Sequence, residues 1–220
     1  MAILNNIETP PSLKEIAFRE IKRAILSNRL ETGKIYNERT LANELGISKT
    51  PVREALLDLV ARGFITFLPR RGFQINTLTE KNICDLFTFR IALEKAVIIH
   101  ITPGISDKSI SEIEGLIEKS SKVLDQTDFL KIDREFHLYL AFLSENQYII
   151  SALVNIRDLI EWVAAKALVV KGRSEEALQE HIAIIGMLKK RDLAGAAEKM
   201  EEHLQITEKR VLSQLTPEKR

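Results

Sequence analysis

The chain has 220 residues, of which 45% are hydrophobic and 29% charged, and its formal net charge is +1. These values are typical of a globular protein and exclude a collagen-like or low-complexity chain. The single cysteine, Cys84, excludes a disulfide within the chain and favours a reducing cytoplasm. The start lacks the basic and apolar runs of a targeting segment, and no stretch reaches the roughly 18–20 apolar residues of a membrane span. We therefore expect a cytoplasmic protein without a membrane partner.

The charge is unevenly distributed along the chain. Residues 1–78 carry 12 Lys and Arg against 8 Asp and Glu, a net charge of +4, whereas residues 79–220 carry 20 against 23, a net charge of −3. A mildly basic first part fits nucleic-acid binding at that end only. Strand-like segments also stop near Leu78, and helical periodicity continues from there to the end. We therefore predict two domains, 1–78 and 79–220.

The first domain is predicted to begin with a helix. Ser12 and Glu15 have the spacing of a capping box, and the helix runs to about Asn28. Its inward face is expected to consist of Ile16, Ile21, Ala24, Ile25 and Leu26. A turn at Gly33 and a short strand over 34–36 follow.

The next stretch has the pattern of two short helices joined by a turn. The apolar stripe of the first helix is formed by Leu41, Ala42 and Leu45. Gly46 ends this helix, because glycine adopts the left-handed conformation that stops a helix. Ser48 has the place of an N-cap for the second helix, whose first turn accepts Pro51 and which Gly63 closes. The buried stripe of the second helix is formed by Val52, Ala55, Leu56 and Leu59.

Polar side chains at the start of this second helix face outward. They are Lys49, Thr50, Arg53 and Glu54. In a helix-turn-helix, this end of the recognition helix enters the major groove of DNA. Two strands, 64–68 and 73–77, are predicted after it, joined by a turn over 69–72 that carries two arginines. Arginines at a hairpin tip are placed to contact phosphates or a minor groove, so the pattern indicates a winged helix-turn-helix.

The residues of this motif resemble a known DNA-binding domain. The run SKTPVREAL, followed by RGFI and RRGF, is similar to the DNA-binding domain of the GntR family of bacterial transcription regulators. The resemblance implies DNA contacts from Arg39, Ser48, Lys49, Thr50, Arg53, Arg71 and Gly72. Lysine stands at position 49, where many relatives have arginine, and lysine lacks the fork of donors for a bidentate guanine contact. Ser48 also has the simpler interpretation of a helix cap, and both roles can hold.

The second domain is predicted to consist of six helices. Their limits are 80–102, 107–125, 128–144, 147–169, 174–190 and 193–214. The breaks between them are short, so neighbouring helices are expected to pack antiparallel. The fold class predicted for the whole chain is therefore mainly α, with a winged helix-turn-helix before a six-helix antiparallel bundle.

Four residues of this domain carry candidate metal chemistry. Asp133 and His137 are four residues apart, so they lie one turn apart on one face of a helix. His181 and His203 lie on the apolar faces of two later helices. One carboxylate and three imidazoles form a suitable ligand set for a divalent transition metal. The spacing alone leaves a second interpretation equally open, namely histidines that are hydrogen-bonded within a core.

The order of these residues resembles the second domain of the same family. The patterns D-x-x-x-H, E-H and M-x-x-H-L are similar to the FCD effector domain of the FadR branch of the GntR family, and six helices point to its VanR-type subgroup. Many members of that branch bind a metal through an Asp and three His. The resemblance therefore implies metal ligation by Asp133, His137, His181 and His203. Zinc is the first expectation for the ion, with nickel, manganese and iron as alternatives.

Arg90 has two interpretations. It can be the ion-pair partner of Glu94, four residues further along a helix. It can also point into the bundle and bind an acidic effector, since a guanidinium suits a carboxylate. In the family that the chain resembles, an arginine at the matching place often lies in the ligand pocket.

These features together predict a transcription regulator, in the simplest case a repressor and not an enzyme. A homodimer would place two recognition helices on a pseudo-palindromic operator in double-stranded DNA. A small carboxylate would bind in the bundle beside the metal and Arg90 and change DNA binding. Two alternatives remain open, a metal-dependent hydrolase and a regulator whose metal is purely structural.

Overall fold

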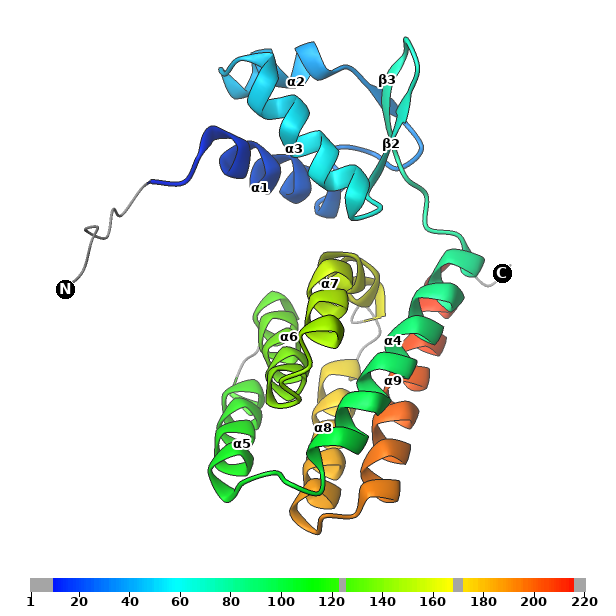
Figure 1. Cartoon of the computed structure of the whole chain (residues 1–220). Helices are drawn as coiled ribbons and strands as arrows, with labels where there is room; N and C mark the ends of the chain where they lie inside the picture. The colour runs from blue at the N-terminus through cyan, green and yellow to red at the C-terminus, as the bar shows by residue number, and fades with distance from the viewer. Residues whose placement is uncertain (1–9, 123–125, 168–171, 216–220) are drawn as a thin grey trace, which may run out of the picture. The chain divides into compact units, whose positions relative to one another are not determined.

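The computed structural model describes residues 10–122, 126–167 and 172–215. The chain forms two compact units, Met1–Thr77 and Leu78–Arg220, which are drawn in Figure 1. The predicted fold class is confirmed, because a winged helix-turn-helix precedes a bundle made only of helices. Within the described residues, no helix is both long and apolar enough to cross a membrane. The arm predicted before Pro11 lies mostly outside these residues.

The part of the first unit that the structure describes contains three helices and a small sheet. Its elements are α1 (Leu13–Leu26), β1 (Ile35–Tyr36), α2 (Glu38–Leu45), α3 (Lys49–Ala61), β2 (Ile65–Leu68) and β3 (Gly72–Ile75). The strands are antiparallel in the order β1-β3-β2, so β3 lies in the middle of the sheet. In this register Phe73 pairs with Tyr36 on one side and with Phe67 on the other. The β2–β3 hairpin is the wing.

Local sequence signals explain where the helices begin and end. The capping box at α1 is confirmed, since the Glu15 backbone N–H donates to Ser12 Oγ and the Ser12 N–H donates to the Glu15 carboxylate. Gly46 ends α2 with a φ of 67°, as predicted for a left-handed cap. The buried stripe of α3 packs on α1 and β2 and forms the core of the unit.

Several details of the first unit differ from the prediction. Ile16 is 38% exposed, and Ala17 is buried in its place, because the inward face of α1 follows the four-residue spacing of Ala17, Ile21 and Ile25. Ser48 has the N-cap position of α3, but its side chain makes no capping hydrogen bond. By contrast, the predicted closure of α3 by Gly63 is confirmed. The helix ends at Ala61, Arg62 is its C-cap, and Gly63 follows with a φ of 77° and an N–H that donates to the Val60 carbonyl.

The second unit contains six helices within its described residues. They are α4 (Glu80–Ile101), α5 (Asp107–Ser121), α6 (Gln126–Leu143), α7 (Gln147–Ala167), α8 (Arg173–Lys189) and α9 (Leu193–Leu215). The limits agree with the prediction to within a few residues where the structure describes them. Residues 123–125 and 168–169, predicted as helix ends, lie outside the described residues. Thr127, predicted as a break, lies inside α6.

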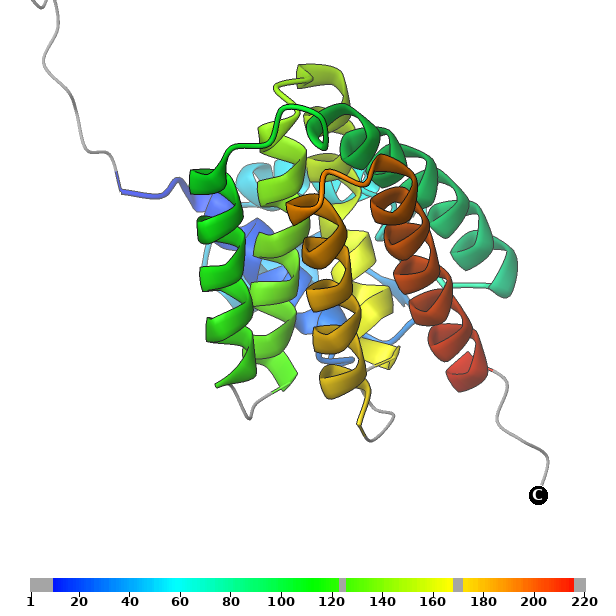
Figure 2. The same ribbon diagram turned by 90° about the horizontal axis from the view of Figure 1, so that it is seen from below.

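The packing of the bundle follows its connections only in part. The pairs α5/α6, α6/α7 and α8/α9 pack against each other as expected from short connections. Helix α4, however, packs mainly along α9, and the two run side by side in Figures 1 and 2. The apolar core of the bundle lies among all six of its described helices, α4 to α9. The bundle therefore brings together helices that are far apart in the sequence.

Gly72 is required by the close approach of two strands. It is the first residue of β3 rather than part of the turn, and its φ is 110°. A Cβ at this position would lie 2.1 Å from the backbone oxygen of Tyr36 on β1. By contrast, a Cβ at Gly46 would meet no atom within 4 Å. A side chain at position 72 would therefore force β1 and β3 to move apart.

We expect Gly72→Ala to open the wing. Backbone strain of this kind costs about 1–3 kcal/mol, and the overlap with Tyr36 adds to it. Hydrogen exchange of the peptide 64–77 should become faster, whereas Gly46→Ala, with strain but no overlap, should change it less. The single tryptophan, Trp162, belongs to the second unit. The unfolding transition of that unit, followed by tryptophan fluorescence, should therefore stay the same in both variants. Equal protection of the wing in both alanine variants would contradict this account.

Candidate functional site

The four predicted metal ligands come together from three helices. Asp133 and His137 lie on α6, His181 on α8 and His203 on α9. Each offers one ligand atom, and these four atoms all lie within 4.8 Å of one another. The three histidines are buried and Asp133 is half-buried. Asp133 therefore forms the more accessible side of the site.

The distances between these atoms match a single coordination centre. His203 Nε2 lies 3.3 Å from both His181 Nε2 and His137 Nε2. The Asp133 carboxylate lies 3.5 Å from His181 Nε2 and 3.8 Å from His137 Nε2. Ligand atoms at about 2.0–2.2 Å from one ion in a tetrahedral site are separated by about 3.3–3.6 Å. Three of these four distances fall in this range and the fourth is slightly longer, so the spacing is close to that of a tetrahedral site.

One buried and one half-buried carboxylate orient the imidazole rings. Glu94 on α4 contacts His137 Nδ1 at 2.5 Å, and Glu180 on α8 contacts His203 Nδ1 at 2.6 Å. An ionised carboxylate can only accept, so Nδ1 of each ring carries the proton and donates it. This turns the Nε2 atoms of His137 and His203 toward each other, and the two atoms are 3.3 Å apart. Metal-ligating histidines typically have such carboxylate partners.

Each of these carboxylates is held by an arginine. Arg90 Nε donates to Glu94 at 2.5 Å. Arg173, which is 2% exposed, donates to both oxygens of Glu180 at 2.7 and 2.8 Å. Arg173 also donates to Thr207 Oγ1 at 2.9 Å. Two chains, Arg90–Glu94–His137 and Arg173–Glu180–His203, therefore end at the same centre.

The charges of these groups follow from their surroundings. Burial acts to raise the pKa of Glu94, but the charge of Arg90 and the contacts with His137 outweigh it, so the pKa lies well below its ordinary value. Burial lowers the pKa of His181 and His203, and neighbouring histidines lower them further. These two histidines are thus neutral at neutral pH, which is the form that binds a metal.

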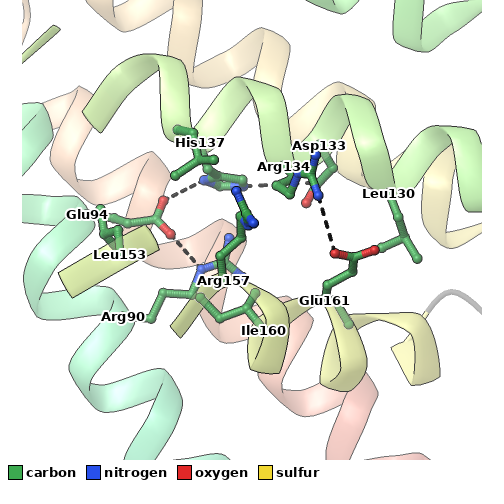
Figure 3. A pocket seen from close by; sticks show the side chains of 12 residues that line it. Arg90, Glu94, Leu130, Asp133, Arg134, His137, Leu153, Arg157, Ile160 and Glu161 are labelled. Carbon is green, nitrogen blue, oxygen red and sulfur yellow. Dashed lines mark hydrogen bonds and ion pairs between the residues drawn. The ribbon is translucent and has the colours of Figure 1, made fainter. Parts of the chain in front are cut away.

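A cavity of ≈ 40 Å³ borders the site, large enough for a few water molecules. Two candidate ligands, Asp133 and His137, form part of its wall, as Figure 3 shows. The other lining residues are Arg90, Glu94, Leu130, Arg134, Leu138, Leu153, Arg157, Ile160, Glu161 and Ala164. The cavity therefore combines an apolar wall with three guanidinium groups and direct access to two candidate ligands.

Three polar atoms of this wall are buried without a hydrogen-bond partner among the described residues. They are Arg134 Nε, Arg157 Nε and one oxygen of Glu161. Arg134 and Glu161 lie 3.6 Å apart, and Arg157 lies 3.5 Å from Asp158, so the charges are paired although these atoms form no hydrogen bond. Buried polar atoms without partners are rare and commonly mark a place for a water molecule or a ligand.

Both interpretations of Arg90 are compatible with its position. It forms the expected ion pair with Glu94, and it also lines the cavity. Glu180, Arg173 and Arg157 are missing from the sequence-based set. Arg173 and Glu180 are seven residues apart, two turns along one face of α8, but nothing in that spacing indicates that they meet His203 on another helix.

The predicted DNA-contacting residues lie on the surface of the first unit. Arg39, Ser48, Lys49, Thr50, Arg53 and Arg71 are exposed, and Gly72 is half-buried. Lys49, Arg53, Arg71 and Gly72 line a common groove of ≈ 430 Å³ between α3 and the wing, whereas Arg39, Ser48 and Thr50 lie outside its lining. The groove also contains an acid, Glu38, which the sequence-based set missed.

Two family models match the chain. The model "Bacterial regulatory proteins, gntR family" matches residues 13–75, and the model "FCD domain" matches residues 85–206. The chain is 26% identical over 190 residues to the uncharacterized HTH-type transcriptional regulator YdhC of Bacillus subtilis, which covers 84% of this chain and 85% of that protein. It is 33% identical over 147 residues to the gluconate operon transcriptional repressor of the same species, and this alignment covers 64% of this chain and 59% of that protein.

Solved structures have the same fold. McbR/YncC of E. coli superposes with a TM-score of 0.76 at 20% identity, over 94% of this chain and 100% of that one. The metal-free FCD domain of TM0439 superposes with a TM-score of 0.56 at 27% identity, over 64% and 98%. Since the FCD model alone covers more than half of the residues, the chain belongs to the DNA-binding transcription regulators of the GntR family that carry an FCD domain.

Proposed function

We propose that this regulator is a repressor whose operator binding is controlled by a small carboxylate, and that the carboxylate binds beside a divalent metal in the helical bundle. The observation that carries the proposal is the convergence of one carboxylate and three imidazole nitrogens next to a cavity lined by arginines. The alternative of a metal-dependent hydrolase is set aside, because the matching relatives are transcription regulators.

The arrangement of lone pairs supports a metal. His203 donates from Nδ1 to Glu180 and is neutral, so its Nε2 carries a lone pair, and this atom lies 3.3 Å from both His137 Nε2 and His181 Nε2 in a buried site. A cation among these nitrogens would be held by such lone pairs. Asp133, His137, His181 and His203 would hold the ion. Three nitrogen ligands and one oxygen ligand suit zinc first, and nickel, manganese or iron as alternatives.

The cavity favours a sensory metal over a purely structural one. A structural ion is usually enclosed by protein ligands, whereas here Asp133 and His137 face open space. Once bound, the ion would supply a positive centre for a carboxylate oxygen. Arg90 would bind the same acid, since it lines the cavity and its pair with Glu94 uses only Nε.

The cavity also supports an effector of modest charge. The ion and Asp133 together contribute one net positive charge, and Arg90, Arg134 and Arg157 each lie beside a carboxylate. One carboxylate on the effector would neutralise this excess. The gluconate operon repressor, a relative by sequence, has a name that links it to the metabolism of a carboxylate. We therefore place the effector of this chain among small carboxylates.

Control of DNA binding requires that the acid favours one arrangement of the protein over another, because equal affinity for both shifts nothing. We propose a homodimer in which each protomer reads half of a pseudo-palindromic operator. Acid binding would change the relative placement of the two DNA-binding units. The boundary between the domains at Leu78, directly before α4, is part of this proposal, because α4 also carries Arg90 and Glu94.

We expect His181→Ala to lose bound metal. The variant removes one of three imidazole ligands, so the purified protein should contain much less metal by elemental mass spectrometry. His100→Ala is the matched control, because His100 is exposed at the end of α4 and should leave metal content unchanged. Helix content from circular dichroism and DNA binding should stay close to those of the wild type. Unchanged metal stoichiometry in His181→Ala would remove this residue from the ligand set.

We expect small carboxylic acids to weaken operator binding through Arg90. A panel of acids titrated into the DNA-bound, metal-loaded protein should identify one that releases DNA. Arg90→Lys keeps the charge but loses the guanidinium fork, so the acid should bind about 10–100-fold more weakly while metal content is retained. Arg210→Lys is the control, because Arg210 pairs with Glu176 and does not line the cavity. An acid that binds the bundle without changing operator affinity would reject the coupling.

We expect Arg53→Ala to weaken operator binding by about 1–3 kcal/mol and to relax base preference. Its guanidinium is exposed near the start of the recognition helix, where side chains reach base edges. Arg19→Ala removes the same charge from an exposed position on α1 and should have little effect. Fluorescence anisotropy with selected and shuffled duplexes measures both affinities. An equal loss on both duplexes would show that Arg53 contacts only phosphate.

A further inference from the structure

An acidic residue lies in the middle of the positively charged DNA-binding surface. Glu38 is the first residue of α2 and is 9% exposed. Its carboxylate accepts two hydrogen bonds from Arg53 Nη1, at 2.9 and 3.2 Å, and lies 3.4 Å from Lys49 Nζ. Both cations are largely exposed, whereas the acid between them is not. One carboxylate therefore holds two of the residues that are expected to contact DNA.

Arg53 is held from a second side by the wing. Its guanidinium carbon lies 5.7 Å from the centroid of the Phe67 ring on β2, within the range of a cation–π contact. The bonds to Glu38 use only Nη1, so Nη2 and Nε take no part in them. A long, flexible arginine is thus fixed between α2 and the wing at the groove that both line. Fixing the side chain before binding lowers the entropy that is lost when it contacts a base.

Glu38 also changes the electrostatics of the surface. Attraction to phosphates is independent of sequence, and it weakens when a carboxylate lies beside the cations. An acid in this place therefore lowers affinity for all DNA. It raises discrimination if the fixed arginine contacts a base edge only in the correct sequence.

We propose that Glu38 is a positioning residue for specificity, which fixes Arg53 for base recognition and suppresses binding to non-operator DNA. This inference rests on the proposed role of Arg53 in reading a base. The expected result is distinctive, because removing the acid should tighten binding to random DNA and weaken the preference for the operator. A residue that only stabilised α2 would not have this effect.

The test compares Glu38→Gln with the wild type in the full-length, metal-loaded chain. The probes are a duplex enriched by the wild-type protein from a random pool and a shuffled duplex of the same composition. In the variant, the shuffled duplex should bind more tightly, with a salt slope steeper by about one, because one more phosphate contact becomes available. The ratio of the two affinities should fall by about tenfold.

Two controls separate this role from others. Glu44→Gln removes the same charge from an exposed position on the same helix and should leave the ratio of affinities unchanged. In an Arg53→Ala background, Glu38→Gln should cause no further loss of discrimination, because the two residues act as one unit. If the Arg53→Ala variant keeps the base preference of the wild type, the proposed role of Arg53 in base recognition is wrong. If Arg53→Ala loses the preference but Glu38→Gln keeps it, the role of Arg53 stands and only the role of Glu38 is wrong. If Glu38→Gln weakens binding to both duplexes equally and unfolds faster than the wild type, the inference is wrong and Glu38 has a purely structural role.

Discussion

The second unit depends on the convergence of three imidazole nitrogens in a buried site. Glu94 and Glu180 accept hydrogen bonds from Nδ1 of His137 and His203, which turns the two Nε2 atoms toward each other at 3.3 Å. Burial lowers the pKa of His181 and His203, so both rings are neutral and each has one nitrogen with a lone pair. These imidazoles and the carboxylate of Asp133 are the ligand set on which the proposed cation site rests.

This constraint extends outward through two arginines to four helices. Arg90 and Glu94 belong to α4, Arg173 and Glu180 to α8, and the ligands to α6, α8 and α9. Buried charges of this kind are tolerated only while every partner is in place. We propose that a change at the centre is passed to α4, which is also the helix that follows the DNA-binding unit in the sequence. The contacts Arg90–Glu94–His137 would make this connection inside the bundle.

Periodicity in the sequence could predict the helices and the inward faces on which the four candidate ligands lie, because these depend on residues within one or two turns. It could not predict Arg173–Glu180–His203, since this chain joins α8 to α9 through side-chain directions that spacing does not determine. It also placed Ile16 in the core in place of Ala17, one residue away. Ser48 shows a similar difference between position and contact. The sequence predicted its N-cap position correctly, but the hydroxyl group forms no capping hydrogen bond with the helix.

The two units use one physical device for different purposes. In each, a buried or nearly buried carboxylate holds a nitrogen-bearing side chain in a single orientation, Glu180 for His203 and Glu38 for Arg53. In the bundle the carboxylate increases the electron density of the ring nitrogen and so favours a cation. On the DNA-binding surface the same negative charge opposes the cation's natural partner, the phosphate. A carboxylate beside a binding group therefore strengthens binding when the ligand is positive and sharpens selectivity when it is negative, because only a ligand with additional matching contacts then overcomes the repulsion.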